Sequence, residues 1–163
     1  MDKAILKTIY AQWLNVKGEA QRACEQRSLP NLAEAYRKCA MFSGKESIEE
    51  LASLYKSPQA VEFCMRYHFP NLATLRTFKG DHPERFGIYI DAGTISLNNP
   101  KEKVLLIGRT TAVVNCSEMR RYNVVCLHSS RAVVNASGWA VVRVEAENGC
   151  NVVKNISENA VIL

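Results

Sequence analysis

The second half of the chain repeats a short pattern of apolar β-branched residues. From Gly87 onward apolar residues alternate with polar or small ones, and from position 104 two or three apolar residues are repeatedly followed by a polar residue and a turn. A period of two predicts β-strands, and a repeated block predicts a stacked architecture. The blocks lie at residues 104–107, 112–115, 123–126, 132–135, 140–143, 151–154 and 160–163.

The spacing of these blocks predicts a β-solenoid with a coil of about twenty residues. Their valines are 9, 11, 9, 8, 11 and 9 residues apart, and Ala-Val-Val-Asn occurs at both Ala112 and Ala132. Asparagine tolerates the corners of such a coil and can form side-chain ladders. The alternative is a small β-sandwich, because hairpins also give strands at intervals of about 8–12 residues. The segment 119–122 resembles a hairpin connection and favours that alternative.

The first half of the chain has the period of helices. Its apolar residues recur every three or four positions, and polar residues that can cap a helix precede several of the apolar runs. This pattern predicts four or five short helices. The first is marked by Ile5, Ile9, Trp13 and Val16, and the starts of the others by Asn31 with Glu34, Ser47 with Glu50, Ser57 before Pro58, and Asn71.

The change of period marks a boundary at residues 79–83, which include a glycine and a proline. We therefore predict an α+β protein. A bundle of short helices occupies residues 1–80, and a β-solenoid of short valine-rich strands occupies residues 81–163.

Composition places the chain among folded proteins. It has 163 residues, of which 47% are hydrophobic and 23% charged, and its net charge is +5. The basic excess is too diffuse for a nucleic-acid arm or a polybasic membrane anchor. The N-terminus lacks the apolar run of a signal peptide, and no stretch approaches the roughly 18 apolar residues of a membrane span. We expect a cytoplasmic protein that does not bind a membrane.

The residue types that carry chemistry are scattered. The six cysteines are far apart and the histidines are not clustered, so we expect small buried thiols and no metal or cofactor. Cys126 and His128 share a strand face, but no oxyanion-hole loop, Gly-x-Ser-x-Gly or P-loop accompanies them. We therefore predict no catalytic residues and no enzyme activity. Asp91 is expected to cap backbone amides in a turn, and residues 145–149 to form a solvated acidic loop.

A resemblance to a known family lies in residues 57–64, in Phe69-Pro70, in residues 87–93 and in the valine-rich strands. With these segments the chain resembles small β-solenoid proteins of unknown function from gut bacteria and their mobile elements. The resemblance covers about two-thirds of the chain. Because its motifs are structural, the resemblance implies the architecture and supplies no activity. It suggests an accessory or inhibitory factor of a mobile element.

The function that we expect is a non-enzymatic interaction or scaffold protein that binds another protein or itself. The last strand, which ends at Leu163, has no polar cap, so we expect either the helical region or a second copy to cover it. Arginine and aromatic residues dominate interface energetics. With Leu163, the candidate interface residues are Arg120, Arg121, Tyr122, Arg131, Trp139 and Arg143.

The alternative function is DNA binding through a helix-turn-helix-like segment at residues 47–79. A second helix that begins near Asn71 would present its first turn to base edges. Acidic residues dilute the charge of this segment, so nucleic acid is a possible partner but not the favoured one. The candidate DNA contacts are Lys56, Arg66, Asn71, Thr74, Arg76 and Lys79.

Overall fold

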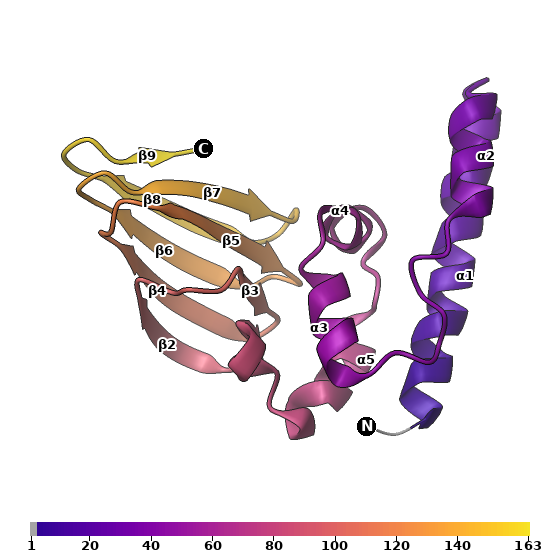
Figure 1. The fold of residues 1–163 in the computed structure, drawn as a ribbon, viewed down its shortest axis with the longest axis horizontal. Coiled ribbons are helices and arrows are strands. Elements are labelled where there is room, and N and C mark those ends of the chain that lie inside the picture. The colour runs from indigo at the N-terminus through magenta and orange to yellow at the C-terminus, as the bar shows by residue number, and fades with distance from the viewer. Residues whose placement is uncertain (1–2) are drawn as a thin grey trace.

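The computed structural model describes residues 3–163 and shows a helical region followed by a β-solenoid (Figure 1). The helices are α1 (Lys3–Gln26), α2 (Pro30–Lys38), α3 (Ile48–Tyr55), α4 (Pro58–Tyr67) and α5 (Leu72–Arg76), with 3-10 turns η1 (Thr77–Asp81) and η2 (Pro83–Phe86). The strands are β1 (Ile88–Ile90), β2 (Gly93–Asn98), β3 (Val104–Ile107), β4 (Thr110–Cys116), β5 (Arg121–Leu127), β6 (Arg131–Ala136), β7 (Val141–Ala146), β8 (Asn151–Ile156) and β9 (Val161–Ile162).

The strands alternate between two parallel sheets. One sheet has the order β1-β3-β5-β7-β9 and the other β2-β4-β6-β8, and we call them the odd sheet and the even sheet. Ala112 lies opposite Ala132, which lies opposite Val152, so these coils are 20 residues long. The first coil is shorter, with a step of 17 residues from Ile88 to its partner Leu105. The solenoid and its coil length are confirmed. The sandwich alternative is wrong, because hairpins pair antiparallel strands whereas every pair here is parallel.

An asparagine ladder runs across the outer face of the even sheet. The side-chain amide of Asn115 donates to Asn98 at 2.7 Å, that of Asn135 to Asn115 at 2.8 Å, and that of Asn155 to Asn135 at 2.8 Å. A slip of one residue would turn these amides into the core and break the ladder. The ladder therefore fixes the strand register, as the repeated asparagines predict.

The odd sheet is buried on both faces where the helices cover it. Leu106 and Val124 point into the solenoid, whereas Leu105 and Val125 pack in one core with helical residues such as Trp13. Figure 1 shows α3, α4 and α5 between the strands and the pair α1 and α2. The helical region and the solenoid thus share a hydrophobic core and hold each other in place.

The helix starts follow the capping residues with one exception. Ser47 and Glu50 form the predicted capping box of α3, Ser57 caps α4, and Asn71 caps α5. The box predicted at Asn31 is wrong, because α2 begins at Pro30 without a side-chain cap. The first helix continues past Gly18 to Gln26 and has 24 residues. Within the described residues, none of the helices has both the length and the hydropathy to cross a membrane.

Candidate functional site

The helices leave the C-terminal part of the odd sheet uncovered. Its outward positions on β7 and β9, together with the residue that follows β9, are Val141, Arg143, Glu145, Val161 and Leu163, which we call the C-terminal face. Val161 is 44% exposed and Leu163 is 66% exposed. An apolar surface next to an edge strand is a site where another chain can bind.

Four of the predicted interface residues meet at one groove of about 430 Å³, which Val141 also lines. They are Arg121, Arg143, Leu163 and Tyr122, the last of which has its side chain buried in the solenoid. The register explains their proximity, because Arg121 lies opposite Val141 and Asn123 opposite Arg143 on the neighbouring strand. The groove therefore combines two guanidinium groups with aliphatic side chains.

The side chain of Tyr122 and the other predicted interface residues lie away from the C-terminal face. The guanidinium of Arg120 lies 4.6 Å from the centre of the Tyr122 ring, and the Tyr122 hydroxyl donates to Asn99 at 2.9 Å. These two side chains thus support the turns between the sheets. Trp139 is 63% exposed in the turn before β7, and Arg131 is in the even sheet. Neither belongs to the C-terminal face.

One of the two expected ways to cover the last strand is wrong. The helical region packs against the outer face of β1, β3 and β5, and Leu163 stays 66% exposed. The helices do not fold back over β9, because their apolar residues are already buried against the first strands of the odd sheet. Cover by a second copy remains a prediction.

The predicted DNA contacts all have partners within the protein. Asn71 caps α5 by accepting from the Thr74 amide at 2.9 Å, and Thr74 is buried. The remaining four are cationic: Arg66 stacks on Tyr67, Lys56 pairs with Glu102, and Arg76 and Lys79 both donate to Asp91. The helix that would read DNA is only five residues long. The contacts of Arg76 and Lys79 hold α5 and η1 on the solenoid, and DNA binding stays an untested prediction.

Asp91 is the centre of this attachment. Its carboxylate accepts from Arg76 Nε at 2.5 Å and from the Arg109 amide at 2.7 Å, which confirms the predicted capping role. The hydrogen bond from Arg76 holds the pKa of Asp91 below its ordinary value, although partial burial opposes this effect. The ionised carboxylate therefore stabilises the folded protein.

We expect Asp91→Asn to lower the free energy of unfolding by about 1–2 kcal/mol at pH 7, because the variant loses charge-assisted bonds in a partly solvated pair. A lowered folded-state pKa stabilises the protein above the unfolded pKa near 3.8, and this stabilisation disappears as the pH falls through the folded value. The variant and the wild type should converge at strongly acidic pH in urea denaturation. Glu49→Gln, which breaks the exposed pair with Arg85, is the control and should change little at either pH. If Asp91→Asn lost as much unfolding free energy at strongly acidic pH as at pH 7, the stabilising role of the Asp91 charge would be contradicted.

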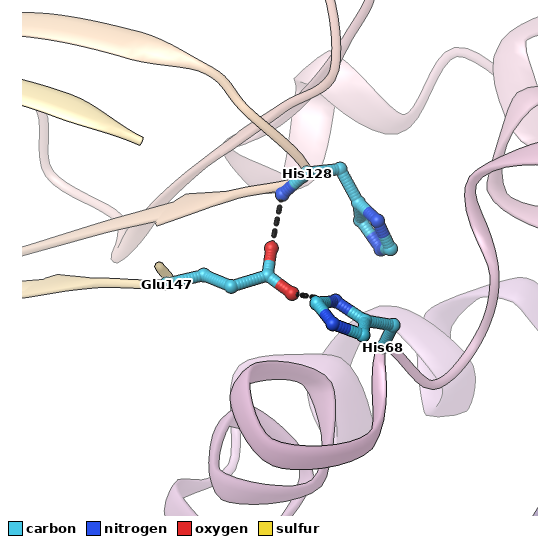
Figure 2. Close-up of side chains that lie close together, drawn as sticks. All are labelled: His68, His128 and Glu147. Atoms are coloured by element: carbon cyan, nitrogen blue, oxygen red, sulfur yellow. Dashed lines mark hydrogen bonds and ion pairs between the residues drawn. The ribbon is translucent and has the colours of Figure 1, made fainter. Parts of the chain in front are cut away.

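A second cluster lies where the helices meet the turns of the solenoid. His68 ends α4, His128 follows β5, and Glu147 follows β7. One ring nitrogen of each histidine and one carboxylate oxygen lie within 4.8 Å of one another, and Figure 2 shows the three side chains turned toward a common centre. The Glu147 carboxylate accepts from the His128 backbone amide and contacts His68 Nδ1.

The sequence pattern does not indicate this cluster, and the prediction for Glu147 is wrong. Residues 145–149 were expected to form a solvated acidic loop, but the Glu147 side chain is 1% exposed. It is buried because the backbone amide of Glu147 pairs with the carbonyl of Cys126, which turns the carboxylate inward toward His128. A coil of about twenty residues could have indicated the pair of His128 and Glu147, which are 19 residues apart. Nothing in the spacing indicates His68.

Three of the six cysteines are small buried core residues, as expected, and the other three are only partly buried. Cys64, Cys116 and Cys126 are buried, and all six thiols are free. Burial raises the pKa of the Cys126 thiol to about 11, so this group is protonated at neutral pH. Its side chain points into the solenoid interior, away from the junction where His128 lies. Cys126 and His128 therefore do not form a nucleophile and its base.

Comparisons with protein-family models, curated proteins and solved structures find no match to this chain. The resemblance to small β-solenoid proteins thus rests on the architecture, a helical region followed by a solenoid of parallel strands.

Proposed function

We propose that this protein is a non-enzymatic, self-associating scaffold in which two copies pack their C-terminal faces together. The observation that carries the proposal is the exposed apolar surface of Val161 and Leu163 on a sheet whose first three strands, β1, β3 and β5, are covered by helices. Packing a second copy there would cover the same surface on both chains, as a two-fold interface requires.

The charges of β7 support a second copy as the partner. Arg143 and Glu145 point to the same side of the strand, and their side chains pair at 2.9 Å. When two such strands face each other antiparallel about a two-fold axis, Arg143 of each copy lies opposite Glu145 of the other. The pattern is complementary to itself, and such complementarity determines partner choice and register.

The test is the oligomeric state. Light scattering after size-exclusion chromatography should give a concentration-dependent mass that rises to twice the 18.3 kDa of the chain. Arg143→Glu should weaken the dimer at least about tenfold, because it places four carboxylates at the interface. The double variant with Arg143→Glu and Glu145→Arg should restore the wild-type affinity, since the exchange keeps both reciprocal pairs.

A matched control tests whether dimerisation depends on the C-terminal face or on any exposed leucine. Leu163→Asp should give a monomer, whereas Leu32→Asp, which changes a leucine of α2 that is 51% exposed, should leave the dimer intact. A wild-type protein that stays monomeric at high concentration would refute the proposal. So would a dimer that Arg143→Glu and Leu163→Asp do not weaken.

A further inference from the structure

Three side chains with metal-ligating atoms converge at the junction of the helical region and the solenoid. We propose that His68, His128 and Glu147 bind one divalent transition-metal ion of the Zn²⁺ type, which joins α4 to two successive coils (Figure 2). This inference is independent of the proposed self-association, because the C-terminal face shares no residue with the cluster.

The donor set suits such an ion. Two imidazole nitrogens and one carboxylate oxygen are ligands that Zn²⁺ accepts, and three protein ligands leave a fourth position for water. Tetrahedral ligands about 2.1 Å from a metal ion are roughly 3.4 Å apart. The three donor atoms here lie within 4.8 Å of one another. Small side-chain rotations are therefore enough to close the site.

The carboxylate of Glu147 requires a cation. Its side chain is 1% exposed, and its ion-pair partner in the structure is His68. A buried carboxylate is costly unless a positive charge and hydrogen bonds compensate it. The His128 amide supplies one hydrogen bond to Glu147. A divalent ion bound between the three side chains would supply this positive charge.

The surroundings of His128 prepare it as a ligand. Its Nε2 contacts the carbonyl oxygen of Pro70 at 3.2 Å, and because a carbonyl only accepts hydrogen bonds, Nε2 carries the proton. A neutral ring with its proton on Nε2 has a free lone pair on Nδ1. A histidine that binds a metal usually donates its other ring nitrogen to such a carbonyl.

The position of His68 opens the site to solvent. Its side chain is 66% exposed, and its ring centre lies 6.2 Å from that of His128. His68 has the left-handed backbone conformation that ends α4, with φ of 50°, and His128 has φ of 52°. The surrounding fold must hold such conformations in residues other than glycine. An ion can therefore enter from the His68 side and bind to groups that are already positioned.

The experiment is a Zn²⁺ titration of tag-free, chelator-treated protein by calorimetry, with Co²⁺ absorption as a probe of tetrahedral coordination. We expect one ion per chain. His68→Ala and Glu147→Gln should each weaken Zn²⁺ binding at least about 100-fold, beyond the usual effect of an outer-shell partner. Glu147→Gln keeps an acceptor for the His128 amide, and His68 is exposed, so both variants should fold.

The chain offers a matched control in its third histidine. His82 contacts Glu84 at 3.1 Å with both side chains exposed, so His82→Ala should leave the Zn²⁺ affinity unchanged. Zn²⁺ should also raise the thermal unfolding temperature of the wild type and of His82→Ala, but not that of His68→Ala. The proposal is overturned if the wild type shows no saturable binding, or if His68→Ala and Glu147→Gln bind as tightly as the wild type.

Discussion

Replacing Trp13 with alanine is expected to lower the free energy of unfolding by about 3–5 kcal/mol. The indole is 1% exposed, and its ring centre lies 4.8 Å from that of Phe63, 5.7 Å from Phe42 and 5.8 Å from Phe69. The variant loses the transfer free energy of the indole and leaves a cavity that these three rings cannot fill. Because small domains are stable by only about 5–15 kcal/mol, the variant should be close to unfolding.

Urea denaturation followed by circular dichroism measures this loss, and Leu14→Ala is the control. Leu14 is the next residue of α1 but is 48% exposed, so its truncation should cost less than about 1 kcal/mol. Phe69 follows His68 directly, so Trp13→Ala should also weaken Zn²⁺ binding by loosening the segment that carries this ligand. Equal losses for Trp13→Ala and Leu14→Ala would contradict the central place of the indole.

The sequence is sufficient to predict the solenoid, because the information for stacking is local and repeated. Each coil of 20 residues places Val114 on Val134 and Asn115 on Asn135, so the period alone predicts which residues are neighbours. The same argument extends to the groove, where the interval from Arg143 to Leu163 is also one coil. Arg131 is outside the groove because consecutive strands alternate between the two sheets.

Helix starts are predictable where one residue decides them. Ser47 and Ser57 accept hydrogen bonds from amides of the first turn, and nothing in their neighbourhood competes. Asn31 fails because Pro30, just before it, already has the backbone angle of a helix, and α2 begins there, two residues earlier than an Asn31 cap would place its start. Glu34 then pairs with Arg37 and Lys38 instead of reaching back to the first turn.

The cluster at the junction was predictable only in part. The proximity of His128 and Glu147 follows from the coil length, because the two residues are 19 positions apart in the sequence and a coil has about twenty residues. His68 comes from a different region, and its place depends on how the helices pack against Leu105, Val125 and their neighbours. That packing is a property of apolar surfaces that fit together, and neither the period nor the spacing of residues encodes it.

The largest effect expected in the solenoid is that of Leu106→Ala. Leu106 is 0% exposed and lies in the interior with Val104 and Val124. Its truncation should lower the free energy of unfolding by about 2–5 kcal/mol, because strands on both sides prevent collapse of the cavity. Leu105→Ala, which faces the helices from the same strand, should cost a similar amount. Val153→Ala on the exposed face of the even sheet is the control and should cost less than about 1 kcal/mol.

Because the helices and the solenoid share a core, we also predict that the two regions of Leu106→Ala unfold together. The chain has two tryptophans, so in a Trp139→Phe background the fluorescence reports on Trp13 alone. Because Leu105 and Trp13 belong to one core, a weakened solenoid should unfold together with the helices. We expect the Trp13 fluorescence and the circular dichroism of Leu106→Ala to shift to the same lower denaturant concentration. A Trp13 transition that keeps its wild-type midpoint would show that the helical region folds independently of the solenoid.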